Sequence, residues 1–187
     1  MNTQYETQRL SLRILDDTHG GMVTDFYNRN FEEFSKYEPL SDRARTLTYH
    51  KKNLEYEYNL FLKGQFFRFF IFEKYNPMTI IGTISYREIQ RDFYESCIIG
   101  YKMDRFKRRM GYCREAIDFA DGLIFNDLKL NRIEATIKPD NVPSMNLLSS
   151  LGYVNEGLLR EKIKINEIFT DHYLFAIIKR DYIALHQ

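Results

Sequence analysis

Short stretches of the chain alternate between apolar and polar residues, which is the pattern of half-buried β-strands. RLSLRIL at 9–15 is the first of these stretches. FFRFFIFEK, which starts at Phe66, is aromatic on both faces and predicts a strand that is covered on each side. TIIGTISYREI follows a turn at Asn76 and Pro77, so the two stretches predict a hairpin, and ESCIIGYKMD at 95–104 predicts the next strand. The middle of the chain therefore reads as an antiparallel meander.

Helical patterns surround this meander. FEEFSKYEPLSD predicts a short helix that Pro39 ends, and residues 18–27 predict another helix ahead of it. TLTYHKKNLEYEYNLFLKG predicts a longer helix that stops at Gly64 and has an apolar side made of Leu47, Leu54, Tyr58 and Phe61. The remaining elements are a helix from Gly111, a strand at 131–138, a short helix over VPSMNLLSSLGY, and strands at 154–165 and 170–179. The pattern predicts one α/β domain over residues 1–187.

Composition and charge limit the classes of function. The 187 residues are 44% hydrophobic and 28% charged, with a formal net charge of +1, which is typical of a globular domain. Partners of a nucleic-acid backbone usually carry a strong basic excess, so direct nucleic-acid binding is not expected. The chain has no apolar run long enough to span a membrane and no apolar leader, so we expect a cytoplasmic protein that does not enter membranes. We expect no metal site, because metal-ligand spacing is missing among Cys97, Cys113, His19, His50, His172 and His186.

A run of cations stands directly before the predicted helix at Gly111: Arg105, Lys107, Arg108 and Arg109. A helix start carries unpaired N–H groups and a partial positive charge, so natural helices favour acidic residues there. Positive charge at this place predicts a bound anion. The alternative is a solvated surface loop, which is common for an isolated basic cluster.

The motif at this turn narrows the kind of anion. A P-loop would close with Gly-Lys-Ser or Gly-Lys-Thr, and a dinucleotide-binding turn would hold three spaced glycines, whereas this turn holds only Gly111. What remains is Arg-x-x-Gly-x-Cys at 108–113, between a strand and a helix. A glycine there lets a pyrophosphate approach the backbone closely.

This motif and its surroundings resemble the GNAT superfamily of acetyl-CoA-dependent N-acetyltransferases, and within it the Rim-type ribosomal-protein N-terminal acetyltransferases. The likeness runs in the family's order through QRLSLR, FYNRNFEEFSKYEPL, IIGTISY, IIGYKMDRFKRRMGYCREA, NRIEATIKPDNVPSMNLLSSLGYVNEGLLRE and TDHYLFAII. It implies a mixed α/β fold with a mostly antiparallel central sheet of about seven strands, flanked by helices and with a splayed pair of central strands. It also implies acetyl-CoA as co-substrate.

The acceptor stays open at this point. The Rim-type resemblance implies the α-amine of a protein N-terminus, while similar chains acetylate polyamines, aminoglycosides or other small amines. A non-catalytic acyl-CoA-binding module is the alternative from another class. The oligomeric state, monomer or homodimer, is open as well.

The resemblance also assigns site residues. The signature would hold the pyrophosphate of the cofactor through backbone N–H groups, within a set formed by Arg108, Arg109, Met110, Gly111, Tyr112, Cys113 and Arg114. The preceding strand would bind the pantetheine arm through the backbone of Tyr101, Lys102 and Met103. Asn141 and Ser144 match an Asn-x-x-Ser element beside the pantetheine and thiol, with Ser144 as proton donor to the leaving thiolate. The alternatives are a helix cap for Asn141 and a hydroxyl that satisfies backbone groups for Ser144.

Three positions depart from the family pattern. Cys113 replaces a glycine or alanine of the signature, while Ile98 and Ile163 stand where relatives can carry a carboxylate base. The proton of the amine would then leave through ordered water, with Glu38 as its terminus and as the second candidate catalytic residue. The alternative for Glu38 is an ordinary surface carboxylate.

Overall fold

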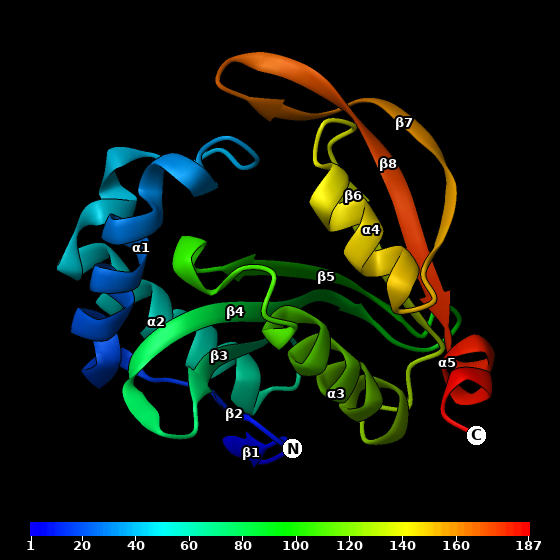
Figure 1. Ribbon diagram of the computed structural model, residues 1–187, viewed down its shortest axis with the longest axis horizontal. Helices are drawn as coiled ribbons and strands as arrows, with labels where there is room; N and C mark the ends of the chain where they lie inside the picture. Colours follow the sequence, from blue (N-terminus) through cyan, green and yellow to red (C-terminus); the bar gives the residue numbers. More distant parts are fainter.

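The computed structural model describes all 187 residues, Met1 to Gln187. One eight-stranded sheet runs through it in the order β1-β2-β3-β4-β5-β6-β8-β7 (Figure 1). The strands are β1 (Gln4–Glu6), β2 (Leu10–Arg13), β3 (Phe67–Glu73), β4 (Asn76–Gln90), β5 (Ser96–Met103), β6 (Arg132–Ile137), β7 (Val154–Ile165) and β8 (Ile168–Ile178). Only β5 and β6 pair in parallel. The expected mixed, mostly antiparallel sheet is confirmed, and the short β1 adds a strand that the sequence did not indicate.

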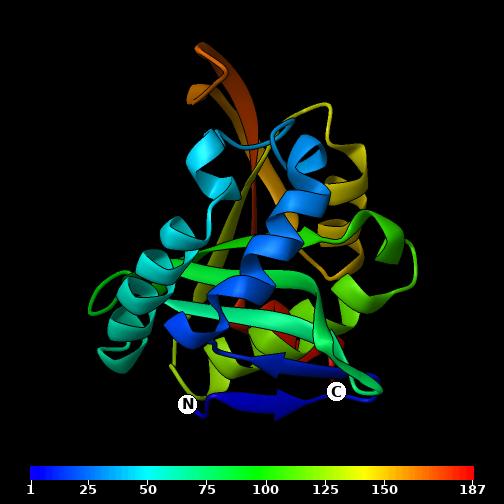
Figure 2. The same ribbon diagram turned by 90° about the vertical axis from the view of Figure 1, so that its left-hand side faces the viewer.

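Helices cover both faces of this sheet. They are α1 (Gly20–Phe34), α2 (Leu47–Leu62), α3 (Tyr112–Asn126), α4 (Val142–Ser150) and α5 (Lys179–Leu185). Figure 2 shows α1 and α2 lying in front of the strands, with α3 behind them. The aromatic strand β3 explains this arrangement, because Phe67 and Phe69 enter the core beneath α3, whereas Phe70 and Phe72 enter the core beneath α1 and α2. The expectation that β3 is covered on both faces is confirmed.

The two central strands separate soon after they begin to pair. β5 pairs with β6 only at Ser96, Cys97 and Ile98, opposite residues 132–134. Beyond Ile98 the edge of β5 that faces β6 has no strand partner, up to its end at Met103. The expected splayed pair of central strands is therefore present, and it leaves a stretch of unpaired backbone in the middle of the sheet.

The separate helix expected over FEEFSKYEPLSD is wrong. α1 instead continues without a break from Gly20 to Phe34, and the chain then runs through turns past Glu38. Gly20 supports the start of α1, since a Cβ placed there would lie 2.6 Å from the Lys51 Cγ on α2. The two helices can approach closely at this point, which offsets the low helix propensity of glycine.

The apolar side expected for α2 is also partly wrong. Leu47 is 46% exposed, while the buried positions are His50, Leu54 and Glu57. Glu57 can be buried because its carboxylate pairs with the Arg68 guanidinium on β3 at 3.0 Å. A polar residue with a tertiary partner thus lies on the buried side of α2, where the pattern placed only apolar residues.

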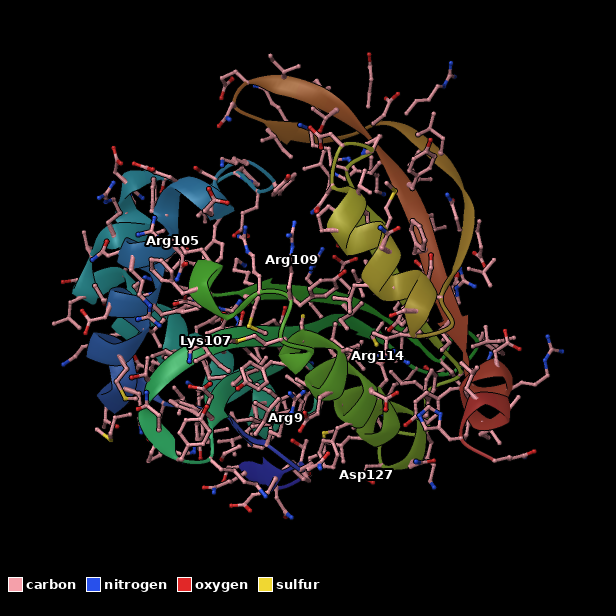
Figure 3. All side chains as sticks on the ribbon, in the orientation of Figure 1. Arg9, Arg105, Lys107, Arg109, Arg114 and Asp127 are labelled. Atoms are coloured by element: carbon pink, nitrogen blue, oxygen red, sulfur yellow. The ribbon has the colours of Figure 1, made fainter.

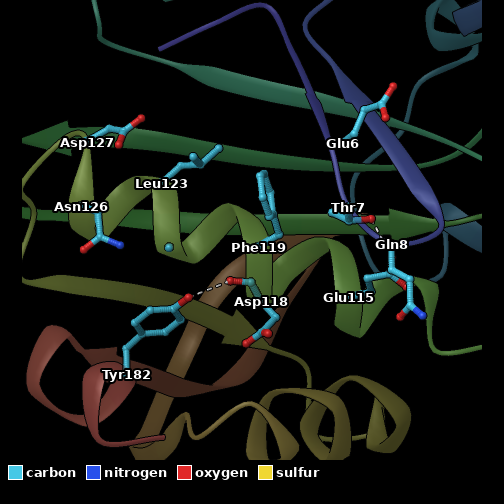
Figure 4. Close-up of a pocket in the computed structure, with 11 residues that line it drawn as sticks. Glu6, Thr7, Gln8, Glu115, Asp118, Phe119, Leu123, Asn126, Asp127 and Tyr182 are labelled. Atoms are coloured by element: carbon cyan, nitrogen blue, oxygen red, sulfur yellow. Dashed lines mark hydrogen bonds between the residues drawn. The ribbon is translucent and has the colours of Figure 1, made fainter. Parts of the chain in front are cut away.

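The helix α5 was not expected. It begins at Lys179, where the sequence suggested the end of a strand, and it packs on α3 through Tyr182. Figure 4 shows the Tyr182 hydroxyl, which donates to the Asp118 carbonyl oxygen at 3.2 Å. None of the five α-helices combines the length and apolarity that a membrane span requires.

Candidate functional site

The start of α3 presents unused hydrogen-bond donors. Thr46 and Asn141 cap α2 and α4 with their side chains, but α3 begins at Gly111 without any side-chain cap. The six backbone N–H groups from Arg109 to Arg114 donate no hydrogen bond within the chain. Arg109 and Gly111 have positive φ values of 62° and 77°, which turn successive N–H groups toward one side. This arrangement fits an anion such as a pyrophosphate.

Arg9 supports this turn from below, although sequence reasoning did not single it out. Its Nη1 donates to the Met110 carbonyl oxygen at 2.9 Å, and its Nε pairs with Glu115 Oε2 at 2.6 Å. The guanidinium also stacks over the Tyr112 ring at 4.7 Å. A Cβ at Gly111 would lie 3.2 Å from Arg9 Nη2, so both the positive φ and Arg9 favour glycine there. In the sequence, only the family resemblance of QRLSLR, which contains Arg9, pointed to this region.

Only part of the basic run is free to meet an anion. Lys107 pairs with the buried Glu73 at 2.8 Å, and Arg108 pairs with Glu33 at 3.0 Å. Burial alone would raise the pKa of Glu73, but hydrogen bonds from Lys107 and two tyrosines outweigh it and lower the pKa. Lys107 therefore fastens the loop to β3 instead of serving a ligand.

The remaining cations make no ion pair within the chain: Arg105, Arg109 and Arg114. Figure 3 shows Arg109 above the start of α3 and Arg114 on its first turns. Arg105 stacks on the neighbouring Phe106 at 4.6 Å. Arg109 and Arg114 thus remain as charges that can balance an anion at the α3 start.

The free edge of β5 faces the start of α4. Tyr101 of β5 and Ser144 of α4 meet there, with their hydroxyl oxygens 2.6 Å apart. Asn141 caps α4, because its side chain accepts from the Ser144 N–H at 3.4 Å. The cap expected as an alternative for Asn141 is present, whereas the Ser144 hydroxyl contacts a side chain from another element instead of its own helix backbone.

Lys102 points to the opposite face of β5, toward α1. Its Nζ lies 2.9 Å from Glu38 Oε2 and 5.7 Å from the centre of the Tyr27 ring. Burial alone would lower the pKa of Lys102, but Tyr27 and Glu38 outweigh it and raise the pKa. Glu38 is therefore no ordinary surface carboxylate. Its other oxygen, Oε1, is buried and has no hydrogen-bond partner in the chain.

Cys113 sits in the first turn of α3 as a thiol. It is partly buried, and burial raises its pKa to about 12. A thiol that stays protonated adds bulk but no charge beside the free N–H groups. The residue that replaces the family's glycine or alanine is thus compatible with an anion at this turn.

A carboxylate that the sequence did not suggest lies beside Ile98. Glu134 of β6 is the register partner of Ile98 at the last pair before the strands separate. Its Oε1 pairs with Arg132 Nε at 2.6 Å, and Arg132 also pairs with Glu156. Only the pairing of β5 with β6 brings these positions together, so no local pattern could have revealed Glu134. Ile163 lies on β7 opposite Thr170.

A groove of about 520 Å³ lies on the outer side of α3, beneath the turn between β1 and β2 (Figure 4). Its acidic lining includes Glu6, Glu115 and Asp118. These carboxylates pair with Lys74, Arg9 and His186, respectively. None of the residues that line the groove comes from β5, so the groove is separate from the β5 edge.

Comparison with known proteins shows which family this chain belongs to. Residues 9–154 match the model of the acetyltransferase (GNAT) domain. The chain belongs to the GNAT acetyltransferase family. Probable N-acetyltransferase YjcK of Bacillus subtilis (strain 168) is 32% identical over 160 residues, which cover 82% of this chain and 84% of that protein. The chain is thus an acetyl-CoA-dependent N-acetyltransferase, and the family expected from the sequence is confirmed.

Two solved structures share the fold of this GNAT acetyltransferase. The crystal structure of ribosomal-protein-S5-alanine acetyltransferase from Vibrio fischeri has a TM-score of 0.90 and 27% identity, and the match covers 97% of this chain and 99% of that one. Mycobacterium smegmatis RimJ in complex with CoA-disulfide has a TM-score of 0.85 and 21% identity, with 91% of this chain and 82% of that chain covered. The resemblance to Rim-type acetyltransferases that the sequence suggested is confirmed by the first of these matches.

Proposed function

We propose that this acetyltransferase transfers the acetyl group of acetyl-CoA to the α-amine of a protein N-terminus, with residues 1–187 acting as one catalytic domain. The observation that carries the cofactor assignment is the uncapped start of α3, where six free N–H groups stand beside the unpaired edge of β5. The similarity to a ribosomal-protein-S5-alanine acetyltransferase along nearly the full length of both chains supports the acceptor class.

The α3 start and the β5 edge divide the binding of the cofactor between them. The N–H groups from Arg109 to Arg114 hold the pyrophosphate, and Arg109 and Arg114 supply uncompensated positive charge. The free backbone of Tyr101, Lys102 and Met103 binds the pantetheine arm as an added strand would. Asn141 caps the start of α4 on the other side of this gap and lies beside the pantetheine arm.

When bound, acetyl-CoA supplies an acetyl group that is activated as a thioester, so the protein needs to contribute little covalent chemistry. The backbone of β5 near Met103 stabilises the charge that develops on the carbonyl oxygen. Ser144 donates a hydrogen bond to the departing sulfur. These groups come from β5 and α4, two rigid elements that hold both reactants in place.

The acceptor amine enters from the face of β5 that carries Lys102. Lys102 holds Glu38 by one carboxylate oxygen, so Oε1 is left to accept the proton of the amine through ordered water. Glu38 lies in the chain between α1 and α2, whereas Ser144 lies on the other face of the sheet. The amine therefore gives up its proton on one side of β5, and the sulfur accepts its hydrogen bond on the other.

A panel of amines tests the acceptor class. Purified protein is incubated with acetyl-CoA and either an N-terminal peptide, the same peptide with a blocked α-amine and a free lysine, a polyamine, or an aminoglycoside. We expect release of coenzyme A thiol and a mass gain of one acetyl group only with the free α-amine. Turnover of the small amines alone would replace this proposal with a small-molecule acetyltransferase.

A further inference from the structure

The Tyr101 side chain has a place in the site that its backbone role does not explain. Its hydroxyl oxygen lies 2.6 Å from Ser144 Oγ, across the gap that opens where β5 leaves β6. This distance is at the short end of the range for O–H···O hydrogen bonds. Ser144 is buried, and Tyr101 packs against the main core, so water competes little for this bond.

The geometry indicates which hydroxyl donates. Each hydroxyl has one proton, so only one of them can donate across the 2.6 Å contact. If Ser144 donated, the Tyr101 proton could reach only the Ser144 carbonyl oxygen at 3.4 Å, which is a long hydrogen bond. If Tyr101 donates, it makes the short bond and leaves the Ser144 proton free. Burial raises the pKa of Tyr101, so the phenol keeps its proton throughout the neutral pH range.

We propose that Tyr101 is a positioning residue whose phenol donates to Ser144 Oγ and thereby directs the Ser144 proton toward the sulfur of the departing coenzyme. This inference rests on the role of Ser144 under the proposed function. During transfer the amine nitrogen forms a bond to the carbonyl carbon and the C–S bond breaks, so that its electron pair stays on sulfur, where the Ser144 hydroxyl stabilises it by a hydrogen bond. The amine loses its proton through water to Glu38, which then releases it to solvent, and the released thiolate takes a proton from solvent, so both side chains return to their starting state.

A double-mutant cycle tests the coupling between the two hydroxyls. We expect Tyr101→Phe to lower kcat about tenfold and Ser144→Ala to lower it about 100-fold, with KM for acetyl-CoA changed less than about twofold in both. The variant with both changes should be no slower than Ser144→Ala, since Tyr101 acts only through Ser144. Tyr58→Phe is the control, because Tyr58 is a partly buried tyrosine of α2 whose hydroxyl makes no hydrogen bond within the chain, and the change should leave kcat unchanged.

The ionisation of bound coenzyme A gives a second measurement that needs no turnover. Thiolate absorbance is titrated with coenzyme A bound to the wild type, to Tyr101→Phe and to Ser144→Ala, with the free protein as blank. Burial raises the pKa of Cys113 to about 12, so its thiol contributes little below that pH. A hydrogen bond to the sulfur favours the thiolate, and we expect its pKa to rise by about one unit in both variants.

The outcomes separate this inference from the proposed function. Tyr101→Phe overturns the inference if it leaves both kcat and the bound thiol pKa unchanged, or if it slows the Ser144→Ala variant by the same factor as the wild type. Normal turnover by Ser144→Ala would remove Ser144 from the mechanism, and Tyr101 with it. Acetyl transfer itself would still stand in that case, because the wild type would release thiol in the amine panel.

Discussion

Arg9 and Met110 are joined by a hydrogen bond from Nη1 to the carbonyl oxygen at 2.9 Å, although they are 101 positions apart in the sequence. Through this bond the residue directly before β2 holds the turn whose N–H groups face the proposed pyrophosphate. Arg13, four residues further along the chain, is a close structural match. It stacks over the Phe72 ring at 4.6 Å and donates to the Pro77 carbonyl oxygen at 3.2 Å, away from the α3 start.

Arg9→Met should raise KM for acetyl-CoA about fivefold, since the loss of one hydrogen bond to the turn is worth roughly 1 kcal/mol. Arg13→Met removes an equivalent stacked arginine and should leave KM unchanged. Steady-state kinetics on both variants, together with their melting temperatures, make the comparison. Equal KM values for the two variants would show that Arg9 acts only on stability.

Gly111→Ala should weaken coenzyme A binding by about tenfold or more, because alanine resists the positive φ that aims the free N–H groups. Gly64→Ala is the matched control, since Gly64 also has a positive φ of 67° but lies at the end of α2. Both variants should lose about 1–2 kcal/mol of stability. Calorimetry should show weaker binding only for Gly111→Ala, and full affinity there would contradict an anion site at this turn.

Glu38→Gln should lower kcat about tenfold, less than the 10² to 10⁴ typical of a direct general base, because Glu38 acts through water. The rate should rise with pH toward the pKa of the acceptor, about 7.7–8.0 for an α-amine. Glu32→Gln, on the exposed side of α1, is the control. If the rate instead reached a plateau far below that pKa, and did so equally in Glu38→Gln and Glu32→Gln, another residue would be the base. Glu134, which lies beside Ile98, would then be the first residue to replace.

Asp121 should make stability depend on pH. It is buried and accepts hydrogen bonds from the hydroxyls of Tyr86 at 2.6 Å and Tyr153 at 2.8 Å, and burial raises its pKa to about 7. Between its ordinary pKa of 3.8 and about 7, the unfolded chain has lost this proton while the folded chain keeps it. Stability contributed by Asp121 is therefore present at acidic pH and falls as pH rises through this window.

Asp121→Asn should remove this part of the pH dependence. The amide does not titrate, so the melting temperature of the variant relative to the wild type should be a few degrees higher at pH 8 than at pH 5. Asp127→Asn, an exposed change near the end of α3, is the control. A constant difference between variant and wild type from pH 5 to pH 8 would mean that Asp121 does not titrate in this window.

The order of most elements could be predicted from the sequence, and the failures have identifiable causes. The alternating stretches at 9–15 and 95–104 correspond to β2 and β5, since one strand face is enough to set a two-residue period. The separate helix predicted at 31–42 is wrong because α1 ends at Phe34, so Pro39 lies beyond any helix and does not end one. The helix α5 was not predicted, because its packing partner, α3, lies far away in the sequence.

The sequence alone was enough to place a strand, a basic run and Gly111 at a helix start, because turn chemistry and periodicity are local properties. It also carried the family resemblance. Only the tertiary structure decided how the charges are used. Lys107 and Arg108 are neutralised by Glu73 and Glu33, which come from other elements.

The side-chain partners inside the site were likewise decided by the tertiary structure. Tyr101 meets Ser144 from 43 positions away, and Lys102, the next residue on β5, turns to the opposite face and holds Glu38. Successive residues of a strand point to opposite faces, so the alternation itself is written in the sequence. Which side chain lies on each face depends on how helices from distant parts of the sequence pack on the sheet. Local sequence patterns contain no information about that packing.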